Sequence, residues 1–528
     1  MDVKNKHNTY NSLFHWHNFR LKLVFESICI GIITGLLIVL YRYVLETAGV
    51  FLAEVYNIIS IKPLLILPWT FAIIIIGYII GLMVKHDPMI SGSGIPQVEG
   101  VLLRKLDMNW WKVLLGKFVG GFLSIGSGLS LGREGPSVQL GAAVGQGFSK
   151  IFKRVKIEER YLITSGASAG LAAAFNAPLA AVMFSLEEVH KNFAPLILLS
   201  TLAAALSADY VARGFFGLKP VFNFENITVL PLKFYFYIVL LGVIVGVFGV
   251  LFNSILLKTQ TLYANQKWLP KEMRVIVPML ISVVIGILLP QALGGGHDLI
   301  LSLVSENIPL TILVVLVLVK FLFTMACYGS GAPGGIFLPL LAIGALIGNV
   351  YGLALVHFVN FDTMYVNNIV ILAMAGYFTA VVRSPITGII LIAEMSGSFK
   401  HMLSLAIVSI VAYIVADILA SKPIYESLLE KFLHNLGEQL AVGSRKHKAI
   451  LEFAVCMGSE LDGKKIKEVK WPNHCLLVSV KRGDLEILPR GDTIIYPGDY
   501  LVVLTNEDKV SSINDALITL IESCEILN

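Results

Sequence analysis

Long apolar stretches alternate with short polar connections over most of this chain, from about Leu23 to about Ala420. Two of them, Phe234 to Leu257 and Ile308 to Cys327, reach or exceed the roughly 20 residues that an α-helix needs to cross a bilayer. Composition agrees, because 56% of the 528 residues are hydrophobic, 15% are charged and the mean hydropathy is +0.77. These values exclude an ordinary soluble enzyme and predict an all-α polytopic membrane protein.

The polar segments predict the topology. Residues 1–21 are rich in His and Asn and lack the apolar core of a cleavable signal peptide, so we expect a cytosolic N-terminal segment. One short connection collects basic residues, and the positive-inside rule places it in the cytoplasm: Lys150, Lys153, Arg154, Lys156 and Arg160. The net charge of +5 lies in such loops and forms no face that would suit a nucleic acid. The spacing of the cysteines predicts neither a metal site nor a disulfide framework: Cys29, Cys327, Cys456, Cys475 and Cys524.

After about Leu433 the pattern changes to short apolar runs separated by turn signals, which is typical of a small α+β domain. We expect strands at Ile450–Val455, Cys475–Val480 and Tyr500–Thr505, turns at Arg482-Gly483 and Pro497-Gly498-Asp499, and a short helix at Lys464–Val469. The chain therefore divides into the segment 1–21, a transmembrane domain at 22–436 and a cytosolic domain at 437–528. Both termini are expected in the cytoplasm.

The membrane part contains an internal repeat. Asn176–Glu187 can be laid over Arg383–Glu394 with an offset of 207 residues, and a Gly-rich segment lies upstream of each. Duplicated halves with interrupted apolar segments predict a transporter of inverted repeats, whose site lies near the membrane midplane. Small residues also serve close helix packing in membranes, and the pattern leaves that alternative open.

Three interruptions of the apolar sequence stand out, at Gly92–Pro96, Gly132–Pro136 and Gly334–Pro339. Non-helical backbone at membrane depth is tolerated only inside the protein or along a cavity, so these loops should be internal. Glycine permits the turn, and the exposed N–H groups at the start of each following helix suit a small anion. The three loops are therefore candidates for an anion site.

These three segments, in this order and joined by Gly128–Leu131, resemble the signature motifs of the CLC family of chloride channels and transporters. Lys422–Tyr425 resembles the entrance to that family's final helix, and the similarity runs from about Phe25 to Leu433. The resemblance implies the CLC fold, a homodimer in the lipid bilayer and one chloride pathway in each subunit. It also implies these chloride-binding residues: Gly92, Ser93, Gly94, Arg133, Gly135, Ile336, Phe337 and Tyr425.

By the same resemblance Glu134 is the external gate, which competes with the anion as a carboxylate and swings away when protonated. A lone carboxylate in an apolar segment costs roughly 2.5 to 3.5 kcal/mol, which favours a functional role over a structural ion pair with Arg133. Glu187 and Glu188 are about 100° apart on a helix and cannot face one cavity. The resemblance makes Glu188 the internal proton acceptor, whereas Glu187, matched by Glu394, is structural.

Retention of Glu134 and Glu188 favours H⁺/Cl⁻ exchange, with a passive voltage- or ligand-gated chloride channel as the alternative. Ser93, where nitrate-preferring relatives carry Pro, favours chloride.

An enzyme is not expected, because the G-x-S-x-G run at Gly166–Gly170 lacks the strand and the partners of a nucleophile elbow. A potassium transport subunit would need filter segments of the T-V-G-Y-G sort, which the sequence lacks. We expect chloride and protons as substrates and no resident cofactor or metal.

The C-terminal domain departs from the CBS domains of animal CLC proteins. Gly458–Gly463, Val478–Gly483 and Pro489–Thr493 resemble the RCK C-terminal (TrkA-C-like) domain of bacterial ion-transport systems. That resemblance implies a bacterial plasma membrane and a dimerising module, which either regulates transport or serves assembly alone. A regulatory ligand would be an anion such as cyclic di-AMP, with Arg482 and Arg490 as candidate contacts.

Overall fold

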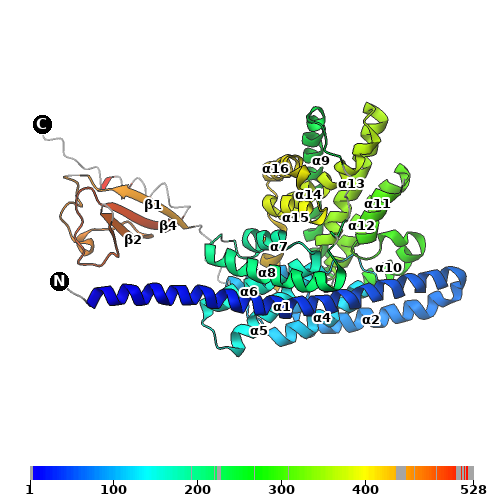
Figure 1. Cartoon of the computed structure of the whole chain (residues 1–528), viewed down its shortest axis with the longest axis horizontal. Coiled ribbons are helices and arrows are strands. Elements are labelled where there is room, and N and C mark those ends of the chain that lie inside the picture. The colour runs from blue at the N-terminus through cyan, green and yellow to red at the C-terminus, as the bar shows by residue number, and fades with distance from the viewer. Residues whose placement is uncertain are drawn as a thin grey trace. The chain divides into compact units, whose positions relative to one another are not determined.

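The computed structural model describes residues 4–506 apart from 192, 219, 223–227, 267, 307, 436–447, 457 and 483–484, together with 513, 516–517 and 519–520. The chain forms two compact units, Met1–Phe432 and Leu433–Asn528. The first is helical and the second contains the described strands (Figure 1). Gly483, the second residue of the predicted turn at Arg482-Gly483, and the fifth cysteine, Cys524, lie outside the described residues.

The first half of the helical unit contains α1 (Lys4–Ile61), α2 (Ile66–His86), α3 (Ile95–Leu102), α4 (Trp110–Gly126), α5 (Glu134–Ile151), α6 (Lys156–Phe175), α7 (Pro178–Phe184) and α8 (Pro195–Phe216). The second half contains α9 (Tyr235–Asn265), α10 (Ile276–Leu288), α11 (His297–Ser305), α12 (Leu310–Gly329), α13 (Phe337–Val359), α14 (Val366–Val382), α15 (Pro385–Met395), α16 (Met402–Ile418) and α17 (Ile424–Asn435). Single turns are η1 (Pro63–Leu65), η2 (Pro88–Ile90), η3 (Ser185–Val189), η4 (Leu232–Phe234), η5 (Lys271–Met273), η6 (Pro290–Ala292), η7 (Thr363–Tyr365) and η8 (Phe399–His401).

The two halves repeat one packing scheme. In the first half α5 packs on α6, α1 on α8 and α6 on α8. In the second half α13 packs on α14, α9 on α16 and α14 on α16. The short helices α7 and α15, one from each half, pack against each other. The predicted inverted-repeat membrane fold is confirmed.

Close packing explains some of the small residues. A Cβ at Gly141 on α5 would collide with the carbonyl of Gly166 on α6, and a Cβ at Gly166 would collide with the carbonyl of Gly141. A Cβ at Gly170 would likewise collide with the carbonyl of Ser137. The G-x-S-x-G run therefore lies inside α6 and serves helix contact, as small residues do in membranes.

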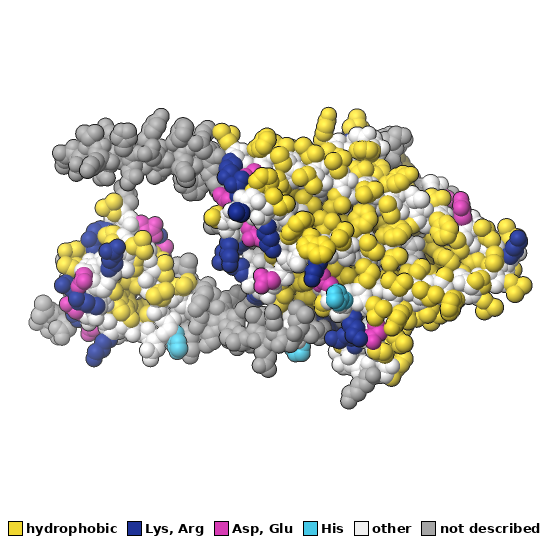
Figure 2. Space-filling model, turned by 90° about the horizontal axis from the view of Figure 1, so that it is seen from below, with side chains coloured by type: hydrophobic (Ala, Val, Ile, Leu, Met, Phe, Trp, Pro, Cys, Tyr) yellow, Lys and Arg dark blue, Asp and Glu magenta, His cyan; other side chains and the backbone are white. Residues whose placement is uncertain are grey.

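The surface of the helical unit matches a bilayer. Eight described helices are long and apolar enough to cross a membrane, from Arg20–Ile61 to Phe399–Ile418. Figure 2 shows hydrophobic side chains over most of the visible face of this unit, with Lys and Arg gathered toward one end. Such an asymmetry of basic residues is typical of the cytoplasmic side of a membrane protein.

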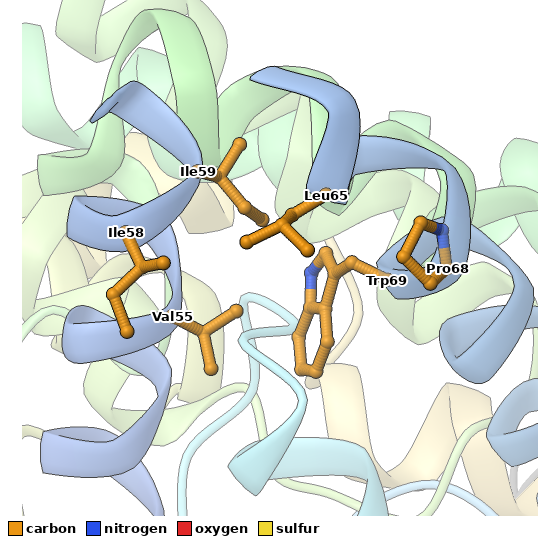
Figure 3. Close-up of a pocket in the computed structure, with 6 residues that line it drawn as sticks. All are labelled: Val55, Ile58, Ile59, Leu65, Pro68 and Trp69. Atoms are coloured by element: carbon orange, nitrogen blue, oxygen red, sulfur yellow. The ribbon is translucent and has the colours of Figure 1, made fainter. Parts of the chain in front are cut away.

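One apolar hollow of about 310 Å³ lies between the end of α1 and the start of α2 (Figure 3). Its lining consists of Val55, Ile58, Ile59, Leu65, Pro68 and Trp69. The side chains converge on the gap from α1, from the turn η1 and from the start of α2. The hollow contains none of the residues that the sequence marks as candidates for chemistry.

The second unit is a four-stranded antiparallel sheet of order β1-β4-β2-β3. Its elements are β1 (Lys448–Ala454), η9 (Ile466–Glu468), β2 (Cys475–Arg482), β3 (Leu485–Ile487) and β4 (Tyr500–Asn506). The core beneath the sheet includes Val480, Leu501 and Val503. The three predicted strands and the turn at residues 497–499 are confirmed, and the expected short helix is a single 3₁₀ turn.

Candidate anion and proton site

The three glycine loops meet through their backbones. The Gly132 N–H donates to the Gly335 carbonyl at 2.7 Å, and the Gly335 N–H donates back to the Gly132 carbonyl at 2.7 Å. The Gly334 N–H donates to the Gly92 carbonyl at 2.8 Å. Segments far apart in the sequence, from both halves, therefore form one hydrogen-bonded junction. The junction lies at the first turns of α3, α5 and α13.

Each of these helices begins in buried surroundings. Gly94, with φ +90°, precedes α3, and a Cβ there would collide with Gln139 on α5. Gly135 brings α5 against the Ser93 loop, where a Cβ would lie 2.8 Å from the Ser93 Cβ. Ile336 and Phe337, at the start of α13, are fully buried. Because first-turn N–H groups have no acceptor within their own helix, their positive ends suit an anion.

Two hydroxyl groups accompany these amides. Ser93 is fully buried, its Oγ accepts a bond from the Ile95 N–H at 3.3 Å, and its hydroxyl also hydrogen-bonds with the hydroxyl of Tyr328 on α12. The Tyr425 hydroxyl, on α17, is buried and has no hydrogen-bond partner among the described residues. The Phe184 ring meets the rings of Tyr425 and Phe337 edge-on, at 6.2 and 5.8 Å between centroids. A buried hydroxyl without a partner favours a bound ligand as its acceptor.

Glu134 is the first residue of α5 and is fully buried. Neither carboxylate oxygen has a side-chain hydrogen-bond partner among the described residues, and the donors that face the carboxylate are the backbone N–H groups of Glu134 and Leu338, in the first turns of α5 and α13. The carboxylate lies over Gly132, where a Cβ would collide with Oε2. Arg133 pairs with Glu46 on α1 at 3.0 Å instead, so the alternative of a structural pair between Arg133 and Glu134 is not observed. A buried carboxylate without a paired cation is costly and therefore favours a functional role.

Glu187 and Glu188 lie in η3, a π-helical turn that follows α7 directly. Turns of this kind are rare and often occur at functional sites. The Ser384 hydroxyl donates to Glu188 Oε2 at 2.9 Å, while Oε1 has no partner among the described residues. Glu188 is 4% exposed. The two neighbouring acids therefore have separate surroundings.

Glu187 and Glu394 cap each other's helices. Glu187 accepts two backbone N–H groups from the first turn of α15, at 3.3 and 2.8 Å, and the Thr387 hydroxyl at 2.7 Å. Glu394, on α15, accepts two N–H groups from the first turn of α7, at 3.1 and 2.8 Å. The donors and the acceptors are related by the same 207-residue offset as the repeats. A carboxylate at a helix N-terminus satisfies free donors and complements the helix dipole.

Comparison with known proteins decides the family. The model of the voltage gated chloride channel family matches residues 76–417, and the TrkA-C domain model matches residues 450–517. The chain belongs to the CLC family. This CLC protein is 37% identical over 427 residues to the H⁺/Cl⁻ exchange transporter ClcA of Vibrio campbellii, an alignment that covers 78% of the chain and 90% of the relative. It is 38% identical over 388 residues to ClcA of Vibrio parahaemolyticus, covering 71% and 82%.

Among solved structures, the CLC chain resembles a slow cyanobacterial Cl⁻/H⁺ antiporter with a TM-score of 0.75 and 31% identity. The match covers 79% of this chain and 98% of that one. The antiporter itself is described as exchanging chloride and protons. A CLC membrane domain followed by a TrkA-C domain, as the sequence predicts, is therefore confirmed.

The CLC chain also contains two buried lysines that the sequence analysis did not single out. The Lys117 ammonium, on α4, donates to the carbonyls of Ile90 and Gly92 at 2.9 and 2.6 Å. Lys320, on α12, donates to Ala292 and Gly294 at 3.0 and 2.6 Å. Both side chains are fully buried, and the two sets of contacts correspond in the two repeats. Each lysine fixes the carbonyls of a glycine loop, and a lone cation in an apolar helix is the signal that could have found it.

In the TrkA-C domain of the CLC chain, Arg482 is engaged internally. Its guanidinium donates to both Asp499 oxygens at 2.8 and 2.7 Å and to the Ile494 carbonyl at 2.9 Å, and it stacks on the Tyr496 ring. Arg490 has an exposed side chain and no ion pair within the described part of the domain. Of the two candidate ligand contacts, Arg490 is therefore the one whose charge faces solvent.

Proposed function

We propose that this CLC protein exchanges chloride for protons across the membrane, with Glu134 as the external gate and Glu188 as the internal proton acceptor. The observation that carries the proposal is the Glu134 carboxylate, which is buried at the start of α5 beside the junction of the glycine loops, with backbone N–H groups of α5 and α13 and no side chain as its donors among the described residues. The relatives and the solved structure that resemble the chain are named as exchangers and support the same reading.

In this proposal chloride is held without a full counter-charge. The Ser93 and Tyr425 hydroxyls and the backbone amides of Ile336 and Phe337 supply donors, while the buried lysines keep their hydrogen bonds to loop carbonyls. Partial charges at helix ends bind an anion well enough to select it and weakly enough to release it. Gly92, Gly94, Gly135 and Arg133 shape the loops rather than donate a side-chain charge to the anion.

Proton coupling follows from the two acids. As a carboxylate, Glu134 competes with chloride for the donors at the helix ends, and once protonated it leaves them. Glu188, which lies in a different segment and accepts from Ser384, passes protons between Glu134 and the cytosol. Anions and protons thus share the Glu134 end of the path and separate toward Glu188.

The test is proton pumping in liposomes that contain the purified protein. A chloride gradient should drive protons uphill, in a fixed ratio to chloride, with liposomes without protein as the control. Chloride movement without any proton movement would overturn exchange and support the alternative, a passive voltage- or ligand-gated chloride channel.

We also propose a homodimer in a bacterial plasma membrane with cytoplasmic termini, in which the domain 437–528 regulates transport. Support comes from the match to the TrkA-C domain and from the basic residues gathered at one end of the membrane unit. The exposed Arg490 favours an anionic ligand, for which cyclic di-AMP is the first candidate, and Arg482 would contribute only by leaving Asp499. Calorimetric titration of the full-length protein with cyclic di-AMP tests this assignment.

A further inference from the structure

Lys191 lies three residues after Glu188, where the chain leaves η3 with a φ of +53°. Its ammonium is 2.8 Å from Glu99 Oε1 on α3 and 3.9 Å from Glu426 Oε2 on α17. The Glu99 side chain is 3% exposed, whereas Lys191 and Glu426 are 38% and 33% exposed. The lysine therefore connects a buried carboxylate to a carboxylate at the edge of the solvent.

The elements that Lys191 joins all contribute to the candidate site. Helix α3 follows the Ser93 loop, and α17 carries Tyr425 directly before Glu426. The π-helical turn before Lys191 carries Glu188. One ammonium thus links the segments that provide two proposed chloride ligands and the proposed proton acceptor.

Lys191 is the cation among the charged groups that act on Glu188. The charged groups that act on Glu188 are Lys191, Glu99 and Glu187, and the Ser384 hydroxyl is its hydrogen-bond donor. Glu187 is already bound to the first turn of α15. Glu99, however, is a nearly buried carboxylate, and a buried charge is costly unless it is paired. Without Lys191, the negative charge of Glu99 would act on Glu188 without this ammonium beside it.

We propose that Lys191 is a positioning residue of the proton path, which neutralises Glu99 and Glu426 at the cytosolic approach to Glu188 and holds α3 and α17 beside it. The proposal rests on the proposed exchange function and adds a residue to it. The proton moves between water and the Glu188 carboxylate, and Lys191 keeps its own protons throughout. With a neutral residue at position 191, a proton from the cytosol would be held between Glu99 and Glu188 instead of being passed on.

The test separates proton flux from chloride flux in reconstituted liposomes. Lys191→Met should lower proton flux about tenfold, because removing a close counter-charge changes the proton affinity of a carboxylate by roughly tenfold or more, and should lower chloride flux much less. Lys191→Arg keeps the charge and should restore the wild-type ratio of chloride to protons. The double variant Lys191→Met/Glu99→Gln should recover much of the proton flux, because the negative charge that Lys191 pairs with is removed together with the lysine.

Lys153→Met is the matched control. Lys153 also has a positive φ, of +50°, lies in an exposed turn after α5 and makes no ion pair within the described residues. Its substitution should leave both fluxes unchanged. Thermal stability in detergent, measured for each variant, identifies any loss that comes from misfolding.

Two outcomes would overturn the role of Lys191 while leaving exchange intact. The first is an unchanged chloride-to-proton ratio in Lys191→Met. The second is an equal loss of both fluxes that Lys191→Arg does not restore, which would make the lysine structural only. Absence of proton flux in the wild-type protein is a different result, because it overturns exchange itself and this proposal with it.

Discussion

Glu134 and Glu188 are both buried glutamates, but their carboxylates have different hydrogen-bond donors. Among the described residues the Glu134 carboxylate has only backbone N–H groups as donors, those of Glu134 and Leu338, whereas Glu188 accepts a hydrogen bond from the Ser384 hydroxyl at 2.9 Å. A carboxylate at the free N–H groups of two helix ends occupies a position that an anion can also take, which suits a gate. A carboxylate that is anchored by a hydroxyl stays in place, which suits a relay.

The gate assignment predicts the behaviour of Glu134→Gln. The neutral amide resembles the protonated side chain, so chloride flux should persist, while proton flux should fall to the background because the amide cannot carry a proton. Both fluxes can be measured in one liposome preparation with chloride and pH electrodes. Proton pumping at the wild-type level in this variant would rule out Glu134 as the coupling residue.

For Glu188→Gln we expect proton flux to fall by at least about tenfold, the result of more than roughly 1.4 kcal/mol of added barrier, with chloride flux preserved. Ser384→Ala is the companion variant, since it removes only the hydroxyl that anchors Glu188. It should lower proton flux less than Glu188→Gln does. If chloride and proton flux fell together in Glu188→Gln, the acid would belong to the shared path.

The functional residues that can be located from the sequence are charged residues within long apolar stretches. Glu134 is visible as an acid in apolar sequence, and the same rule would have revealed Lys117 and Lys320. Tyr328 could not be found in this way, although its hydroxyl hydrogen-bonds to Ser93, because a tyrosine in an apolar helix is ordinary. Partners such as Ser384 depend on contacts between the halves, which no local pattern encodes.

At the scale of elements, the short helices α7 and α15 depend on each other. Each leaves first-turn N–H groups that its own half does not satisfy, and Glu394 and Glu187 supply the acceptors from the opposite half. The sequence predicted that Glu187 and Glu394 correspond, because their spacing from the preceding proline is the same. The exchange of caps could not be predicted, since spacing does not say which helix a side chain reaches.

This exchange predicts that Glu394→Ala destabilises the membrane unit by roughly 1.5 to 3 kcal/mol, the range for hydrogen bonds to a charged group. Glu187→Ala should have a similar effect because it removes the equivalent contacts. The midpoint of thermal unfolding in detergent measures both, with Glu394→Gln, which keeps one acceptor, as the milder comparison. Wild-type stability in Glu394→Ala would contradict the capping role.

In the TrkA-C domain, alternating sequence predicted β1, β2 and β4 to within two residues at their ends. The strand β3 was missed because it has only three residues, Leu485–Ile487, too few for a period-two pattern to emerge. The pair of Arg482 with Asp499 was also missed. It joins the end of β2 to the turn before β4, and sequence alone suggested a free arginine for a ligand.

The Arg482 pair predicts a dependence of stability on pH. Burial alone would raise the pKa of Asp499, but the Arg482 guanidinium and the Tyr496 N–H hold that pKa below its ordinary value. A lowered pKa in the folded state stabilises the domain above the unfolded pKa of about 3.9, and this contribution is lost as the pH falls through the folded value. Asp499→Asn should therefore destabilise the domain at neutral pH and much less in strong acid.

Hydrogen exchange of peptides from β2 and β4 in the full-length protein, corrected for intrinsic rates, measures that difference. Asp492→Asn is the control, because Asp492 forms a pair with Lys467 at 2.6 Å but its side chain is 75% exposed. Exposed pairs contribute roughly 0 to 1 kcal/mol, so this variant should exchange like the wild type. Equal changes in hydrogen exchange for the two variants would mean that the buried Asp499 pair stabilises the domain no more than the exposed Asp492 pair does.

At the scale of the whole molecule, the division into two units follows from composition. The helical unit has an apolar exterior that requires a bilayer, whereas the sheet unit has its own core, to which Val480, Leu501 and Leu517 contribute. All the candidate chloride and proton residues lie in the first unit. The boundary was predicted at residue 437, and the helix α17 runs through this region to Asn435.

We expect that a chain ending after residue 447 remains folded and moves chloride, because the candidate site is complete without the sheet unit. If the TrkA-C domain regulates transport, the full-length protein should change its chloride flux when cyclic di-AMP is added, and the shortened chain should not. Adenosine monophosphate serves as the control nucleotide. Identical flux from both chains at every concentration would leave the domain with a role in assembly alone.

The exchanged caps of α7 and α15 bear on how such a protein can arise. A polypeptide made of one half alone would leave the first turn of its short helix unsatisfied inside the membrane, where unpaired backbone groups cost several kcal/mol. Two copies would cap each other's short helices only if they inserted in opposite orientations, since the halves are inverted repeats. An ancestor of single length would thus have needed dual topology, and fusion of two genes would have fixed the orientation of each half.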